Sequence, residues 1–290
     1  MKKILLLTVT VSIALITMLF ATIFFTSPSS ASKKNESKIR VIVTIPPQAE
    51  FVERVGGERV QVTVMVPPGF SPHTYEPKPS QLKEVEEAEI YFAMGSGIDF
   101  EITWLSKLRE INEAMLVVNC SEGIQIIDRD PHVWLSPRNA KIIVNNVYKT
   151  LVQVDPANKQ YYRENLEAYL RELDDLDGEI KTLFSNVTNR IFIVYHPSWG
   201  YFARDYGLIQ ISIEREGKEP TAASIAALIE QAKRLNIKVV VVSPQFNVKS
   251  AEVIADEIGG KIIFADPLAK DYISNLRSVA SKLSEVMSQK

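Results

Sequence analysis

The sequence predicts an α/β protein of two lobes, each a mostly parallel four-stranded sheet flanked by helices, joined by one long connecting helix. Short β-branched runs alternate with helical segments of roughly ten residues, once before residue 155 and again after residue 189. Such alternation is typical of parallel sheets that are covered on both faces. The stretch from Lys159 to Phe184 holds neither a proline nor a strand pattern. These observations divide the chain into residues 32–155, 156–188 and 189–290.

The first lobe opens with a β-branched run that ends at two prolines. Residues 39–45 read IRVIVTI, and the helix that follows closes on Gly56 and Gly57. A later helix begins at Pro79, a position where a missing backbone N–H costs nothing. We expect strands at 39–45, 59–66, 90–95 and 114–120, and helices at 48–57, 79–89, 101–113 and from Pro137 onward.

The second lobe repeats this plan. We expect strands at 190–195, 208–213, 238–243 and 261–265, and helices at 199–206, 221–235, 249–258 and 271–288. Because a helix separates each strand from the next, the sheet is expected to be parallel.

The connecting helix is predicted by apolar residues that recur at spacings of four and three. They are Tyr162, Leu166, Tyr169, Leu173, Leu176, Ile180 and Leu183. This spacing places them along one side of a single helix. At 1.5 Å per residue such a helix is roughly 38 Å long, enough to run along two small lobes. Gly178 leaves open the alternative of two helices with a break. A continuous helix offers few hinge residues, so we expect the lobes not to swing far apart.

The first 31 residues are expected to be a signal peptide or an N-terminal membrane anchor. Lys2 and Lys3 precede an uncharged apolar run at 4–25, and small polar residues follow it. The run is long for a signal peptide and long enough to cross a bilayer of roughly 30 Å, so both alternatives stay open. Either one exports the rest of the chain to the periplasm or the cell surface.

Charge and cysteine content narrow the function classes. The chain has 33 basic and 35 acidic residues and a net charge of −2, which offers no basic surface for nucleic acid. The single cysteine, Cys120, cannot form an internal disulfide and lies far from the apolar N-terminal run, so it cannot carry a lipid there. We expect it to be a small interior residue at the end of a strand.

The three histidines and one aspartate stand in loops where a parallel sheet binds ligands, beyond the carboxyl ends of strands. They are His73, His132, His196 and Asp266, and each is the neighbour of a proline. Proline restricts the backbone and so reduces the freedom lost when ligands gather around an ion. A single histidine at a strand end is commonly a surface or hydrogen-bonded residue. Taken jointly, the four residues suggest a metal site in a cleft between the lobes, and on these residues alone both interpretations stay open.

Four stretches resemble, in the same order, motifs of the periplasmic zinc- and manganese-binding proteins of ABC importers, the cluster A-I solute-binding proteins. They are PPGFSPHTYEPKPSQL, DPHVWLSP, YHPSWGYFARDYGL and FADPLAKDYISNL, and the resemblance covers residues 39–288. It implies a receptor, not an enzyme, that binds one divalent cation between two α/β lobes and delivers it to a membrane permease. It also implies the metal ligands His73, His132, His196 and Asp266.

This ligand set favours zinc over manganese. Imidazole suits zinc, whereas manganese prefers oxygen ligands. Manganese-selective members of the family tend to have a carboxylate at the position of His196. The chain lacks the histidine-rich loop of typical zinc members between its first two ligands, so manganese, or iron, stays an alternative cargo. Glu214 and Glu219, in the family-like stretch EREGKEPT, are expected to be solvated or to lie behind the ligands.

A zinc hydrolase is the alternative from another class. Catalytic zinc usually has three protein ligands and an open position for water, whereas four protein ligands would close the site. No HExxH run occurs, and Glu76, three residues after His73, stands in no motif. The stretch AMGSGID lacks the third glycine of a dinucleotide-binding loop and is expected to turn the chain near the cleft. An adhesion role has no supporting feature in the sequence.

Overall fold

The computed structural model describes residues 38–214, 219–246 and 248–289. Residues 1–31, expected to be a signal peptide or an anchor, lie outside these ranges. Within them, no helix combines the length and apolar character that crossing a membrane requires. The chain from Lys38 onward forms one compact unit.

The described residues form two four-stranded sheets whose strands are all parallel, which confirms the predicted fold class. The first sheet has the strand order β2-β1-β3-β4 and the second the equivalent order β6-β5-β7-β8. The strands are β1 Ile39–Val43, β2 Val60–Val64, β3 Ile90–Ala93, β4 Leu116–Asn119, β5 Ile191–Val194, β6 Ile209–Ser212, β7 Val239–Val242 and β8 Lys261–Phe264. In the first sheet, Val43 pairs with Val64 on one side and Phe92 on the other.

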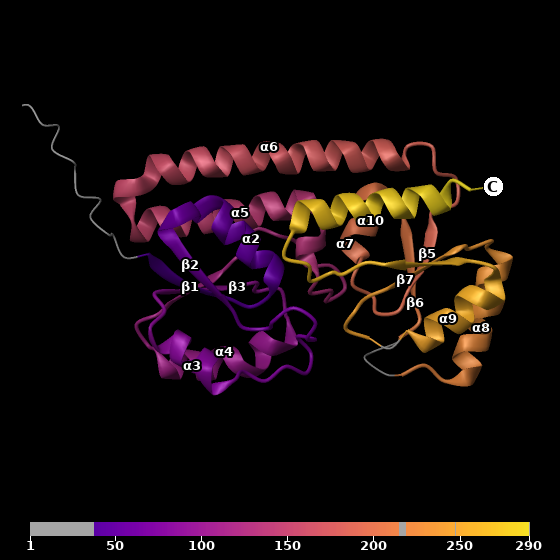
Figure 1. The fold of residues 1–290 in the computed structure, drawn as a ribbon, viewed down its shortest axis with the longest axis horizontal. Helices are drawn as coiled ribbons and strands as arrows, with labels where there is room; N and C mark the ends of the chain where they lie inside the picture. Colours follow the sequence, from indigo (N-terminus) through magenta and orange to yellow (C-terminus); the bar gives the residue numbers. More distant parts are fainter. Residues whose placement is uncertain (1–37, 215–218, 247, 290) are drawn as a thin grey trace, which may run out of the picture. The chain divides into compact units, whose positions relative to one another are not determined.

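Helices cover both faces of each sheet (Figure 1). Around the first sheet, α2 and α5 lie on one face and α3 and α4 on the other; around the second, α7 and α10 lie opposite α8 and α9. The helices are α2 Pro46–Gly56, α3 Pro79–Glu86, α4 Asp99–Ile111, α5 Pro137–Val154, α7 Gly200–Tyr206, α8 Ala222–Arg234, α9 Lys249–Ile258 and α10 Tyr272–Met287. Within each sheet, a helix thus links each strand to the next one and returns the chain to the same edge, as parallel pairing requires.

Helix α2 begins at Pro46, two residues before the predicted start, because prolines suit the first helical turn. Gln48 in this turn is buried. Its side-chain oxygen accepts the backbone N–H groups of Thr44 at 3.0 Å and Ile45 at 3.1 Å, and its amide donates to the carbonyl of Phe92 at 2.9 Å. One side chain therefore fixes the loop after β1 against β3.

The long connecting helix, α6 Lys159–Phe184, is continuous through Gly178. The predicted seam is buried from Tyr162 to Ile180, whereas Leu183 is half-buried and Phe184 takes the last inward position. Figure 1 shows α6 lying along both lobes, with α5 and α10 beside it. The alternative of two helices is therefore wrong.

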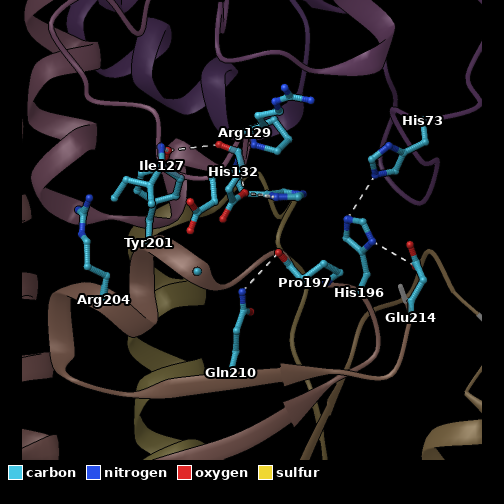
Figure 2. A pocket seen from close by; sticks show the side chains of 14 residues that line it. His73, Ile127, Arg129, His132, His196, Pro197, Tyr201, Arg204, Gln210 and Glu214 are labelled. Carbon is cyan, nitrogen blue, oxygen red and sulfur yellow. Dashed lines mark hydrogen bonds and ion pairs between the residues drawn. The ribbon is translucent and has the colours of Figure 1, made fainter. Parts of the chain in front are cut away.

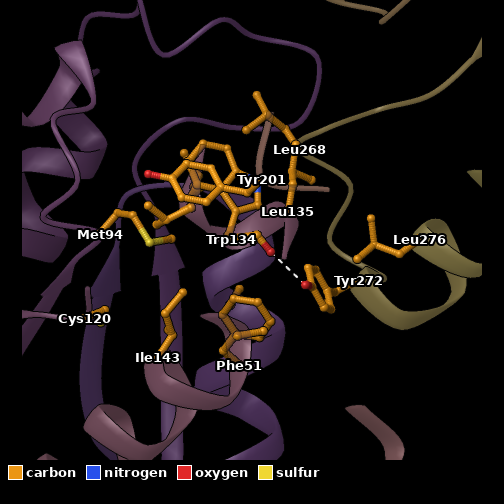
Figure 3. Packing of buried hydrophobic residues seen from close by; sticks show 14 of the residues in the cluster. Phe51, Met94, Cys120, Trp134, Leu135, Ile143, Tyr201, Leu268, Tyr272 and Leu276 are labelled. Carbon is orange, nitrogen blue, oxygen red and sulfur yellow. Dashed lines mark hydrogen bonds between the residues drawn. The ribbon is translucent and has the colours of Figure 1, made fainter. Parts of the chain in front are cut away.

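One buried core continues from the first sheet into the second. The cluster that includes the α6 seam also includes residues of β1 and β5. At the junction, Trp134 donates its indole N–H to the carbonyl of Pro267 at 2.7 Å, and Tyr272 donates its hydroxyl to the carbonyl of Trp134 at 2.7 Å. Figure 3 shows Tyr272 and Trp134 meeting between the two halves. The lobes are therefore packed against each other as well as joined by the helix.

Candidate metal centre

The three histidines lie together at the carboxyl ends of the strands (Figure 2). His73 is on the loop between β2 and α3, His132 is on the loop after β4, and His196 follows β5. One nitrogen of each ring lies within 4.8 Å of the others. The Nε2 atoms of His73 and His196 are 3.3 Å apart. Ligand nitrogens about 2.1 Å from a tetrahedral zinc ion are about 3.4 Å from each other, so this spacing fits a shared cation.

A carboxylate contacts the Nδ1 atom of each ring. The pairs are His73 with Asp99 at 2.6 Å, His132 with Asp130 at 2.7 Å, and His196 with Glu214 at 3.2 Å. A carboxylate that accepts the Nδ1 proton fixes the tautomer and leaves the Nε2 lone pair for a metal. The donor set is therefore three imidazoles of the same tautomer.

These carboxylates were only partly anticipated from the sequence. Asp130 has a local signal, because its Oδ1 also accepts the backbone N–H of His132, two residues on, at 2.9 Å. Asp99 has no such local signal, because it lies at the start of α4, 26 residues after His73. Glu214 is 6% exposed and in contact with His196, so it lies behind a histidine and is not solvated.

The three imidazoles differ in burial. The side chain of His73 is 34% exposed, against 10% for His132 and 12% for His196. Burial, and to a smaller extent the neighbouring His132 and His73, lower the pKa of His196 to about 3. The His196 ring is therefore neutral at physiological pH, which is the form that binds a metal. His73 forms the open side of the site.

The loop that carries His132 is held by the second lobe. The hydroxyl of Tyr201, on α7, accepts the backbone N–H of Ile127 at 3.0 Å and donates to the carbonyl of Asp130 at 3.2 Å. Because His196 belongs to the same lobe as Tyr201, this contact fixes the two buried imidazoles relative to each other.

A cleft of about 490 Å³ opens beside the histidines. Its other walls are residues 127–131, Pro197, Gly200, Tyr201, Arg204, Gln210 and Glu214. Figure 2 shows these side chains arranged around the space next to His132 and His196. The cleft gives a dissolved cation a path to the ring nitrogens.

Asp266 stands apart from the histidine group, because the atoms within 4.8 Å of one another include none of its oxygens. Its Oδ1 accepts the backbone N–H of Leu268 at 2.9 Å and the side-chain amide of Gln245 at 2.8 Å. Leu268 and Gln245 line a small pocket that all three histidines also line. Phe246 stacks on His196 with ring centroids 5.0 Å apart. Asp266 is thus hydrogen-bonded to two residues, Gln245 and Leu268, that line the pocket beside the histidines.

The remaining residues singled out in the sequence have other surroundings. Glu76 is exposed on the loop after His73. Glu219 accepts the hydroxyl of Tyr195 at 3.1 Å. Cys120 is buried, and burial raises the pKa of its thiol, as expected of an interior residue.

The two-lobed fold and its histidine cluster define a solute-binding protein for a metal ion, and comparison with known proteins gives the family. The family model for the periplasmic zinc-uptake complex component A, ZnuA, matches residues 41–286. The chain belongs to this family, as its four motifs indicated.

The relatives of this chain are named for more than one metal. The chain is 32% identical over 255 residues to the high-affinity zinc uptake system protein ZnuA of Bacillus subtilis, covering 80% of this chain and 79% of that protein. It is 28% identical over 292 residues to the manganese ABC transporter substrate-binding lipoprotein PsaA of Streptococcus pneumoniae, covering 89% and 92%. A crystal structure of ZnuA superposes with a TM-score of 0.84 at 44% identity, covering 87% of this chain and 100% of that one.

Proposed function

We propose that the protein is an extracytoplasmic receptor that captures a divalent cation and delivers it to the permease of an ABC importer. The proposed ligands are His73, His132, His196 and Asp266. The observation that carries the proposal is the group of three imidazoles, each with a carboxylate on Nδ1. The metal is the cargo of the protein.

The ligand chemistry favours zinc as the cargo. Three imidazoles form a nitrogen-rich set, which suits zinc better than manganese. The Bacillus subtilis relative is a zinc uptake protein, whereas the Streptococcus pneumoniae relative is a manganese protein. Manganese, or iron, is therefore the alternative cargo.

Asp266 completes the set by moving toward the histidines when the cation arrives. The charge of the ion attracts the carboxylate past Gln245 and Leu268, which line the intervening pocket. A fourth protein ligand leaves no open position for a reacting water, which separates a receptor from a zinc hydrolase.

Export and delivery follow from the same role. Residues 1–31 act as a signal peptide or a membrane anchor, residues 32–155 and 189–290 form the lobes, and residues 156–188 connect them. The permease distinguishes the filled protein from the empty one by the positions of the cleft loops, a shift in populations that the cation biases. Relatives include substrate-binding lipoproteins of ABC transporters.

Metal titration of the apo protein tests the proposal. We expect one zinc per chain, and zinc at a thousandfold excess over its Kd adds about 4 kcal/mol to the free energy of unfolding. His132→Ala removes one imidazole, so we expect zinc affinity to fall by more than about 100-fold in a competition titration. Glu76→Ala, an exposed change near His73, is the control and should leave the affinity unchanged.

Several results would contradict this function. They are the absence of a thermal shift with zinc, manganese and iron, and a zinc titration that His132→Ala leaves unchanged. Direct competition between zinc and manganese decides the cargo. A cobalt-substituted protein whose spectrum reveals an exchangeable water on the metal would favour the hydrolase instead.

A further inference from the structure

A buried carboxylate in the first lobe has no place in the proposed ligand set. Glu101 lies in the first turn of α4 and is 7% exposed. Its Oε1 accepts the backbone N–H of Met94 at 2.6 Å and the hydroxyl of Thr44, and its Oε2 accepts the backbone N–H of Gly95 at 2.9 Å. Burying a carboxylate costs free energy unless donors surround it, and here three donors do so.

These donors hold the loop between β3 and α4 in one conformation. Gly95 and Gly97 have φ angles of 73° and 99°, which favour glycine. A Cβ atom on Gly95 would lie 1.9 Å from the side-chain oxygen of Asn119, so the loop also passes close to β4. The AMGSGID stretch does turn near the cleft, as expected, and it turns around the Glu101 carboxylate.

The same loop contacts the ring of His73 and the backbone next to His132. Ser96 donates its hydroxyl to the carbonyl of Pro131, the residue before His132, at 2.6 Å. Asp99, at the end of the loop, lies 2.6 Å from Nδ1 of His73. A displacement of the loop would therefore disturb His73 directly and the His132 loop at the same time.

We propose that Glu101 is a positioning residue of the metal centre, which sets Asp99 against His73 and Ser96 against Pro131 by holding the β3–α4 loop. The inference rests on the metal-binding function proposed above. Glu101 acts through the loop and is not itself a ligand.

The arrangement requires a carboxylate, because both oxygens accept a backbone N–H. A glutamine in either orientation would turn its amide NH₂ toward the N–H of Met94 or of Gly95. Glu101→Gln keeps the size of the side chain and opens no cavity. The substitution therefore removes a hydrogen bond to the β3–α4 loop but changes the packing around residue 101 little.

Zinc competition titrations on the full chain test this role, with Glu101→Gln, Asp99→Asn and the double variant beside the wild type. We expect Glu101→Gln to weaken zinc binding about tenfold, at the lower end of what residues that orient ligands contribute. Because Glu101 acts partly through Asp99, the double variant should lose clearly less than the product of the two single effects. The absorption spectrum of the cobalt-loaded Glu101→Gln protein should also shift toward that of Asp99→Asn.

Glu50→Gln is the matched control. Glu50 is a partly buried carboxylate on α2 that accepts the hydroxyl of Tyr169 at 2.7 Å and the backbone N–H of Tyr272 at 2.5 Å. Its burial raises its pKa, as burial does for Glu101. Glu50→Gln should lower the thermal stability but leave the zinc affinity and the cobalt spectrum as in the wild type.

The outcomes separate this inference from the function on which it rests. Unchanged zinc affinity in Glu101→Gln, effects that multiply with those of Asp99→Asn, or an equal loss in Glu50→Gln would each overturn the positioning role. A wild-type chain that binds no metal would overturn the function instead. If Glu101→Gln does not fold, Thr44→Val removes one of the three donors and leaves the carboxylate in place. It should then give a smaller loss of zinc affinity that again depends on Asp99.

Discussion

In the metal centre, a carboxylate lies against the Nδ1 atom of each imidazole and accepts its proton. With Nδ1 engaged, a ring offers Nε2 to a cation without changing its tautomer, and it loses little freedom on binding. His196 shows this most fully, since its ring is buried, packed under Phe246 and hydrogen-bonded to Glu214. The exposed ring of His73 keeps the site accessible.

The burial of His196 makes the stability of the apo protein depend on pH. Its pKa is about 3 in the folded chain and about 6.5 in an unfolded one. Its contribution to stability is complete above pH 6.5. As the pH falls from about 6.5 toward 3, the unfolded chain binds a proton that the folded chain does not, and up to about 1.4 kcal/mol is lost per pH unit.

We expect His196→Asn to remove this dependence, because its amide can still donate to Glu214 but binds no proton. The measurement is the free energy of unfolding of both apo proteins in urea at about pH 7 and about pH 5. The difference between the two proteins should shift by 1–2 kcal/mol, roughly, between these pH values. A difference that stays constant with pH would show that the buried ring is not the source.

Sequence reasoning located the three histidines because each lies next to a recognisable strand or helix. It could not locate Asp99 or Glu101. Their partners are brought near by the β3–α4 loop, and no local pattern in the sequence encodes that approach. Asp266 stays a prediction, since its carboxylate is held by Gln245 and Leu268.

Helix α7 begins at a glycine and helix α6 continues through one. The first glycine is crowded by neighbouring side chains, whereas the second faces open space. A Cβ atom on Gly200, the first residue of α7, would lie 2.5 Å from Oδ2 of Asp130 and 3.2 Å from the amide of Gln210. A Cβ atom on Gly178, within α6, would meet nothing within 4 Å. Alanine is more favourable than glycine inside a helix by about 0.5–1 kcal/mol.

Alanine at the two positions should therefore have separate effects. Gly178→Ala should raise the free energy of unfolding by about 0.5–1 kcal/mol and leave zinc binding unchanged. Gly200→Ala should push the Asp130 carboxylate away from His132 and weaken zinc binding about tenfold. Thermal unfolding and zinc competition on both variants check this. Equal zinc affinities would mean that the Asp130 contact has no influence on the metal.

For whole helices and strands, the sequence predicted the bounds well where the apolar periodicity is strong and less well where it is weak. Every strand lies within its predicted range but ends one or two residues early. The reason is that the extended run continues into the loops that carry the site. The seam of α6 continued through Gly178 because its spacing did not slip there. The early start of α2 was missed because paired prolines look like the end of a strand as much as the start of a helix.

The whole molecule combines a shared core with an exposed cleft loop. The unbroken seam of α6 predicted that the lobes keep their arrangement. It could not predict the contacts that reinforce this, such as Trp134 with Pro267 or Ser136 with Asp205, since they join residues far apart in the chain. The His132 loop is fixed by these contacts, whereas much of the His73 loop, residues 67–78, is exposed.

Zinc binding should therefore order a loop without closing a hinge. We expect the radius of gyration from small-angle X-ray scattering to differ by less than about 1 Å between the apo and zinc-loaded protein, because a continuous helix and a shared core resist hinge rotation. When zinc binds, amide hydrogen exchange should slow in residues 67–78, because His73 gains a bond to the metal. Exchange around His132 should change less. Tyr272→Phe, which removes the hydroxyl bound to Trp134, should enlarge the change in radius, because that contact restrains the lobes. A contraction of several ångströms in the wild type, with exchange in the His73 loop unaltered, would mean that capture works by lobe closure instead.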